Sequence, residues 1–259
     1  MKTLLKPIAL ATSLAASLAL LAAPALADEL VRENRSVDAR VTKVKLGGVV
    51  DLVVRQGNTA SLVVSGDKRY VQRITTSQRG DTLEIDTESL NNRRGEMQEK
   101  LRAELTVPKL SEFSSEGVGA SSVTGFSGDT LRVSLDGAGA VTMNGNYRAI
   151  DASLGGVGGL TLNGVRTERL DLSLRGAGRI NVSGESKALH ARLAGVGSLD
   201  AQNLRAETVD LDMSGLGGAT VHASRAAEVD LSGMGSATVY GKPASRRANT
   251  SGMGKVAWK

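Results

Sequence analysis

Apolar and polar residues alternate along most of the chain from about Val37 onward. A period of two is typical of β-strands, whereas an amphipathic helix would repeat every 3.6 residues. The apolar members recur as sets of three: Leu131, Val133 and Leu135; Ile150, Ala152 and Leu154; Leu170, Leu172 and Leu174; Val209, Leu211 and Met213. The pattern predicts an all-β chain.

A Gly-X-Gly tripeptide follows each set and recurs roughly every 18 to 20 residues, after a weaker first copy at Gly117. The later pairs are Gly137 and Gly139, Gly156 and Gly158, Gly176 and Gly178, Gly195 and Gly197, Gly215 and Gly217, Gly233 and Gly235, and Gly252 and Gly254. The alternation then resumes with Val141 and Met143, Leu160 and Leu162, Ile180 and Val182, Ala219 and Val221, and Ala237 and Val239. A fixed period of this length indicates a repeat architecture.

One repeat cannot fold alone. Its six inward side chains contribute on the order of 10–15 kcal/mol, while ordering about nineteen residues costs roughly 1–2 kcal/mol each. Stacked copies share a continuous core, so the sequence predicts a parallel β-helix (β-solenoid) of about eight coils, with strands about 4.8 Å apart. The paired glycines are expected at its corners, where φ is positive or a Cβ has no room.

The residue between the two glycines is apolar in every copy, and we expect these residues to form further internal stacks. They are Val118, Ala138, Val157, Ala177, Val196, Leu216, Met234 and Met253. At the C-terminal end, Trp258 is expected to face inward and close the core. Arg246, Arg247, Lys255 and Lys259 would discourage edge-to-edge pairing there.

Residues 1–27 have the pattern of a secretory signal peptide: Lys2 and Lys6, a Leu- and Ala-rich run, and Ala25-Leu26-Ala27 before Asp28. A retained membrane anchor is the alternative. The chain has no Cys, which excludes a lipoprotein anchor at the cleavage site. The mature chain is predicted to be periplasmic, with secretion or surface display as alternatives, and no later segment could span a bilayer as a helix.

The mature chain is expected to form one continuous body with two parts. Residues 28–110 carry strands without Gly-X-Gly and a charged loop, Ser89–Lys100, and are predicted to be irregular capping coils; residues 111–259 are the regular repeats. The net charge of +5 includes Lys2 and Lys6, so about +3 remains after cleavage. With few aromatic residues and mixed charges, the chain is not expected to bind nucleic acid.

Each candidate motif for catalysis or for cofactor binding is incomplete in this sequence. A strand follows every Gly-X-Gly, whereas a dinucleotide-binding loop leads into a helix. A calcium-binding nonapeptide repeat would need Asp where Leu160 stands. His190 and His222 lie two coils apart in different columns, so no nucleophile–His–acid arrangement is predicted. The sequence therefore predicts a protein that is not an enzyme and has no cofactor or metal.

One outward face gathers acidic residues on adjacent coils: Asp210, Asp212, Glu228 and Asp230. Like charges at about 5–7 Å repel one another unless they are compensated. One hypothesis is a patch for a divalent cation or a cationic ligand. The alternative is a charge ladder neutralised by Arg192 on one side and Arg247 on the other.

Five sequence segments, in this order along the chain, resemble those of a known family: VVDLVVRQG, VVSGD, GDTLEI, LTVPKL, and the GAG and GVG coils. Together they resemble the head GIN domain of putative autotransporter adhesins, over nearly all of the mature chain. The resemblance implies an exported β-helical protein, with adhesion suggested and no catalytic residues to carry over.

Three function classes follow. The first is a binding or adhesion module for an unidentified envelope or extracellular polymer or protein. The second is a polysaccharide-active enzyme, which fold analogy alone would support. The third is a structural or stress-related envelope protein. The sequence leaves the ligand, the oligomeric state and the handedness of the coil open.

Overall fold

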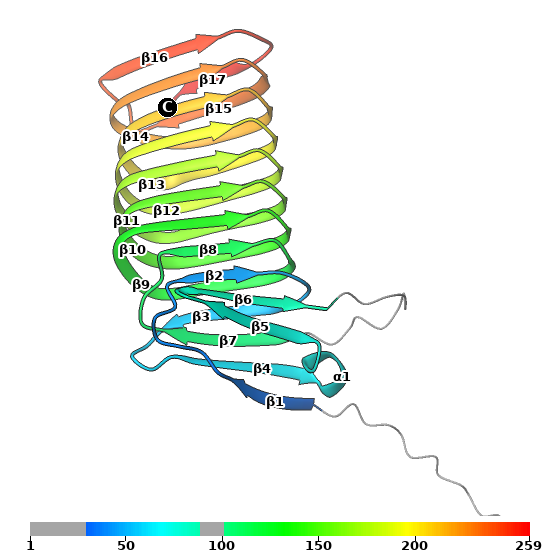
Figure 1. Ribbon diagram of the computed structural model, residues 1–259. Helices are drawn as coiled ribbons and strands as arrows, with labels where there is room; N and C mark the ends of the chain where they lie inside the picture. The colour runs from blue at the N-terminus through cyan, green and yellow to red at the C-terminus, as the bar shows by residue number, and fades with distance from the viewer. Residues whose placement is uncertain (1–29, 89–100) are drawn as a thin grey trace, which may run out of the picture.

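The protein is described by a computed structural model that covers residues 30–88 and 101–259 (Figure 1). The predicted signal peptide (residues 1–27) and the charged loop (Ser89–Lys100) lie outside the described residues. Within the described residues, no helix is both long and apolar enough to cross a membrane. The strands of this part of the chain belong to one 17-stranded sheet that winds into a column (Figure 1).

Six long strands form the body of the column, and each runs from the residue between one pair of glycines to the residue two positions before the next pair. They are β9 (Val118–Leu135), β10 (Ala138–Leu154), β11 (Val157–Leu174), β12 (Ala177–Leu193), β13 (Val196–Met213) and β14 (Leu216–Leu231). Each pairs in parallel with the next, so every coil hydrogen-bonds to the coils on either side. The predicted parallel β-helix is confirmed.

The predicted inward columns form the core. Leu135 pairs with Leu154, and Leu154 with Leu174, in one continuous register. All the residues assigned above to the columns before and after the glycines are buried, none of them more than 4% exposed. Period-two alternation therefore predicts which side of each strand faces the core, because successive side chains point to opposite faces.

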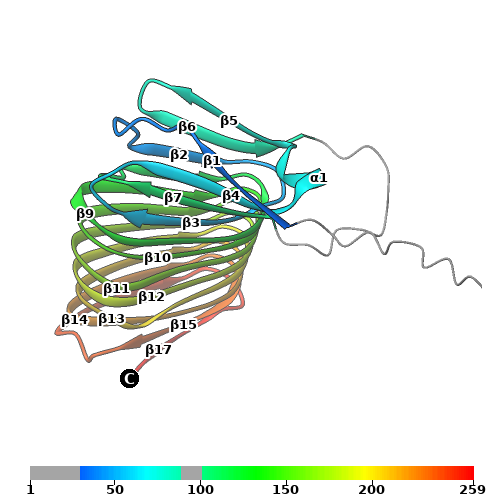
Figure 2. The ribbon, with the colours of Figure 1, turned by 90° about the horizontal axis from the view of Figure 1, so that it is seen from below.

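The N-terminal part caps the column with mixed strand directions (Figure 2). Its elements are β1 (Leu30–Arg35), β2 (Lys43–Leu46), β3 (Asp51–Gln56), β4 (Ser61–Asp67), α1 (Lys68–Val71), β5 (Ile74–Arg79), β6 (Thr82–Thr87), β7 (Arg102–Val107) and β8 (Glu112–Ser115). β2 pairs in parallel with β8, and β3 with β9, which continues the column. β4 pairs antiparallel with β1 and β7 across its end. The boundary between residues 28–110 and 111–259 stays a prediction.

Three short strands form the C-terminal end: β15 (Met234–Tyr240), β16 (Ser245–Thr250) and β17 (Lys255–Trp258). β15 and β16 pair with β14, and β17 pairs with β15. Trp258 is partly buried against the core, and the Arg246 guanidinium lies 5.8 Å from the centre of its ring. A stacked cation over an indole is favourable, and the side chain lies at the end of the core as the sequence predicts.

Candidate functional site: an apolar strip at the glycine corners

The residues between the paired glycines lie on the outside of the column, so their assignment to the core was wrong. The alternation continues through each corner without a break: Leu154 is buried, Gly156 and Gly158 lie on the same side of the strand as Leu154, and Leu160 is buried again. Val157 lies on the opposite side of the strand and is 62% exposed. The error came from treating hydrophobicity as evidence of burial where the period-two rule already placed the side chain outside.

The glycines themselves allow the corners to stack. At Gly158, φ is +148°, a value that L-residues rarely adopt, and an added Cβ would collide with the carbonyl oxygen of Gly139 in the coil before it. Gly139 and Gly178 meet the same obstacle from the coil that precedes each of them. Neighbouring backbones therefore approach more closely at the corners than any side chain would permit.

The exposed apolar residues of the corners form a single continuous file, which we call the corner strip. Val49 bridges to Val118, so the file begins in the cap and runs the length of the column. Its members are Val49, Val118, Ala138, Val157, Ala177, Val196, Leu216, Met234 and Met253. Of the exposed large apolar residues in the described chain, all except Leu30 belong to this strip.

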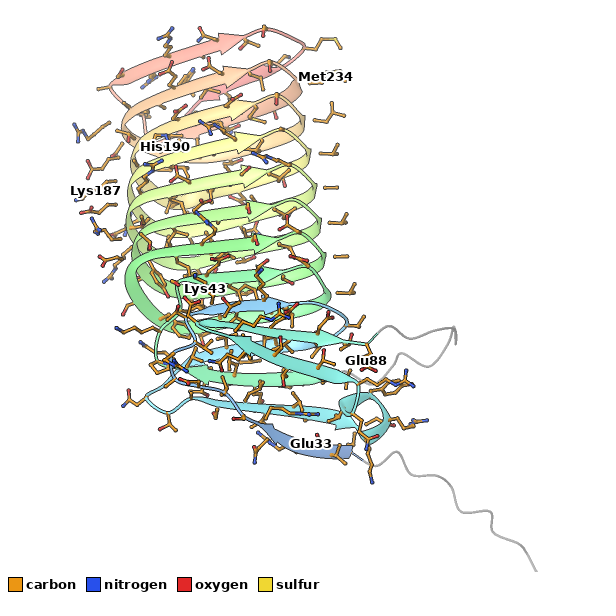
Figure 3. The ribbon with its side chains drawn as sticks, in the orientation of Figure 1. Glu33, Lys43, Glu88, Lys187, His190 and Met234 are labelled. Carbon is orange, nitrogen blue, oxygen red and sulfur yellow. The ribbon has the colours of Figure 1, made fainter. Side chains whose placement is uncertain are left out.

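A different organisation holds on the opposite side of the column, where Figure 3 shows Lys187 far from Met234. Charges alternate in sign from coil to coil along one file: Asp129, Arg148, Glu168, Lys187, Glu207 and Arg225. Ion pairs join them two by two, with N···O distances of 3.3 Å, 2.8 Å and 2.9 Å. This ladder was not predicted, and it neutralises itself.

The ion pairs of this ladder predict a pKa shift at Glu168 that can be measured. Glu168 accepts a hydrogen bond from Lys187, which holds the pKa of Glu168 below its ordinary value of 4.5. The pair therefore stabilises the fold above that value, and the stabilisation is lost as the pH falls through the lowered pKa. In an NMR titration, Lys187→Gln should move the Glu168 pKa upward toward 4.5. Lys45→Gln, in the cap, serves as the control, and equal pKa values in both variants would contradict the ladder.

The structure places the predicted acidic patch on neighbouring coils, with Asp210 beside Glu228 and Asp212 beside Asp230. Three of these carboxylates have polar partners on an adjacent coil: His190 Nδ1 lies 3.3 Å from Asp210, Arg247 Nε lies 3.4 Å from Glu228, and Asn249 donates to Asp230 at 2.7 Å. Of the two arginines predicted to neutralise the patch, Arg247 thus contacts it directly, while His190 and Asn249 add polar contacts.

Within residues 30–88 and 101–259, no group of three or more His, Cys, Asp or Glu side chains is placed to hold a metal ion. A cation or cationic ligand at the acidic patch stays a prediction. His222 lies on another part of the surface, where it lines a hollow with Arg205 and Glu207.

The stacked coils, the paired glycines and the external strip define the class of this protein as a parallel β-solenoid. Residues 40–243 match the family described as "Putative auto-transporter adhesin, head GIN domain". The chain belongs to this family, and the resemblance seen in the sequence is confirmed. None of the curated proteins matches the chain.

Several solved structures share the fold. A putative adhesin from Bacteroides fragilis is 21% identical, with 90% of this chain and 98% of that chain covered and a TM-score of 0.66. A putative adhesin from Parabacteroides distasonis is 17% identical, with 89% and 97% covered and a TM-score of 0.77. A protein from the same species described as a "Putative lipid binding protein" is 16% identical, with 89% and 96% covered and a TM-score of 0.75. At these identities the likeness concerns the fold alone.

Proposed function

We propose that this protein is an exported, non-enzymatic binding module of the bacterial envelope that attaches to its partner through the corner strip. One observation carries the proposal: in residues 30–88 and 101–259 the exposed large apolar side chains, Leu30 apart, are collected in one file instead of being scattered. Scattered apolar residues are normal on protein surfaces, whereas a contiguous exposed patch marks an interaction site.

The surroundings of the strip support the same function. The charged file on the opposite side of the column consists of opposite charges paired within the chain, so its attraction for an external charged partner is weak. Among the residues that the structure describes, the corner strip has no such partner. The family and neighbour descriptions, adhesin in most cases and lipid binding in one, also describe attachment and not chemistry. The signal peptide predicted for residues 1–27 is consistent with a place in the periplasm or at the surface.

Attachment of coated beads tests the proposal. Beads carrying the mature chain should bind to intact cells, or to isolated cell-wall sacculi, of the producing bacterium. The variant Val157→Ser/Val196→Ser/Leu216→Ser should bind at least about tenfold less, because three apolar contacts at roughly half a kilocalorie each amount to one decade.

A matched control changes three exposed amides outside the strip: Asn146→Ser/Asn163→Ser/Gln202→Ser. This control should bind like the wild type. Equal binding by the strip variant and the wild type, with both folded by circular dichroism, would reject the corner strip as the attachment surface.

A further inference from the structure

We propose that the partner of the corner strip is a second copy of this chain, laid antiparallel with strip against strip. The inference rests on the proposed function, because it takes the strip to be the contact surface and names what covers it. Each coil contributes to this surface a row of five residues, from the one before the first glycine to the one after the second. The two ends and the residue between the glycines lie on the outer side of each row, where the first end and the centre are exposed and the last end is exposed or half-buried.

Two neighbouring rows have complementary shapes. Residues 155–159 read Gly-Gly-Val-Gly-Gly, with a large centre between bare ends, and residues 175–179 read Arg-Gly-Ala-Gly-Arg, with a small centre between large ends. They lie side by side, since Val157 pairs with Ala177 in the sheet. In a two-fold contact, row i of one copy meets row j of the other and row j meets row i. With a two-fold axis midway between these rows, each of the two rows in one copy lies against the complementary row of the other copy, so the complementary contact is made twice.

In this arrangement Val157 of one copy faces Ala177 of the other, and Arg175 and Arg179 lie over Gly155 and Gly159. Two chains running in opposite directions about an axis across the strip keep the first end of each row opposite the first end of its partner row. Both arginines therefore meet glycines, which leave room for their side chains.

The same axis extends to the next rows outward. Ala138 would face Val196, which again sets a small side chain against a larger one. Val118 would face Leu216, which sets two larger side chains against each other, so the pairing of small with large centres covers the four central rows, from Ala138 to Val196.

The charges at one flank of the strip are also complementary in this arrangement. A shallow hollow of about 530 Å³ includes the C-terminal half of the strip, from Val196 to Met253, and Arg175, Ala194 and Ser214 also line it. The antiparallel copy would place its Asp136 over Ala194, one coil from Arg175, and its Glu116 over Ser214. The two acidic ends of rows would thus enter the hollow beside an arginine.

The size of the strip sets the expected affinity. Eight rows face each other about this axis, from Val49 to Met234, and at about 4.8 Å a row with a row width of about 13 Å they give roughly 500 Å² on each partner. The total of about 1,000 Å² is at the lower limit for a specific interface, so a weak, micromolar dimer is expected. A bilayer is a poorer match, because Glu116 and Asp136 flank the strip and its files contain no Trp or Tyr, the residues typical of membrane interfaces.

Cysteine cross-linking tests the pairing, because the chain has no Cys of its own. In the antiparallel dimer, position 118 faces position 216 of the partner, while identical positions lie five coils or about 24 Å apart, beyond the roughly 7 Å that a disulfide can bridge. Under a mild oxidant, Val118→Cys alone and Leu216→Cys alone should stay monomeric on a denaturing gel. A mixture of the two should form a covalent dimer. A parallel dimer would cross-link each single variant, and that result would overturn the proposed pairing.

Sedimentation of the mature chain between about 1 and 500 µM gives the second measurement. A dimer should form, and Ala177→Leu, which fills the notch, should weaken it at least about tenfold, while Ala244→Leu, exposed elsewhere, should not. A monomer at every concentration together with no cross-linking would overturn the inference. If strip-dependent attachment to cells or to phospholipid vesicles persisted in that case, the proposed function would stand with a different partner.

Discussion

Replacing Gly158 by alanine should lower the melting temperature by roughly 5–15 °C, as expected for a loss of about 2–5 kcal/mol in a chain of this size. Two costs add. The residue holds φ at +148°, a backbone conformation that costs an L-residue about 1–3 kcal/mol, and the new Cβ would collide with the Gly139 carbonyl. That oxygen belongs to a backbone held by the coil stacking, so relief requires the two coils to separate.

The neighbouring glycine provides the control. At Gly159 the nearest atom to an added Cβ is the Arg179 carbonyl oxygen at 4.0 Å, which is an ordinary contact, and φ is not in the left-handed region. Gly159→Ala should therefore be neutral, or stabilise the fold by a few tenths of a kilocalorie, because alanine restricts the unfolded chain. Both variants are compared by circular dichroism at low protein concentration. Similar losses in the two would show that stacking of the corner backbones is not what selects glycine.

The architecture could be predicted from the sequence because three local signals agree at every coil. Period-two alternation, a fixed spacing of paired glycines, and a repeat too short to bury its own core all require stacked coils. Leu135, Leu154 and Leu174 fall into one column on these grounds alone, and the structure pairs them in register.

The surface strip was missed although the sequence contains its signal. Counting by twos from Leu154 through Gly156 and Gly158 reaches Leu160 and passes over Val157. The alternation therefore places Val157 on the outside, although its apolar side chain suggests burial. Hydrophobicity indicates which environment a side chain prefers, whereas the pleat of the strand determines the side to which it points. At the corners the two disagree, and such disagreements concentrate at functional sites.

The alternating charge ladder was missed although its members share one spacing. Each of its six residues stands eight positions before the first glycine of the next pair, as Asp129 does before Gly137 and Arg148 before Gly156. Counting forward from the preceding glycines fails, because neighbouring coils shift register on this side, as they do between Asn144 and Ala149. Counting back from the next pair would have found the file. The antiparallel strands of the cap carry no repeat, so their directions could not be predicted from the sequence.

Two substitutions three residues apart separate the core from the strip. Leu154 is fully buried and Val157 is 62% exposed, although both are apolar and belong to the same coil corner. Leu154→Ala should cost about 2–5 kcal/mol, because it removes buried methyl groups and leaves a cavity in a column that cannot collapse between fixed coils. Val157→Ala should change the stability of the monomer by less than about 0.5 kcal/mol.

Urea unfolding at low protein concentration, where any dimer has dissociated, measures both free energies. The same Val157→Ala variant should then show its effect elsewhere, as weaker attachment of coated beads and weaker self-association. If it instead destabilised the monomer as much as Leu154→Ala, Val157 would belong to the core and the strip would lose its central residue. The corner strip lies outside a core that is complete without it. Val157 should therefore contribute little to the free energy of folding and much to the contact with a partner.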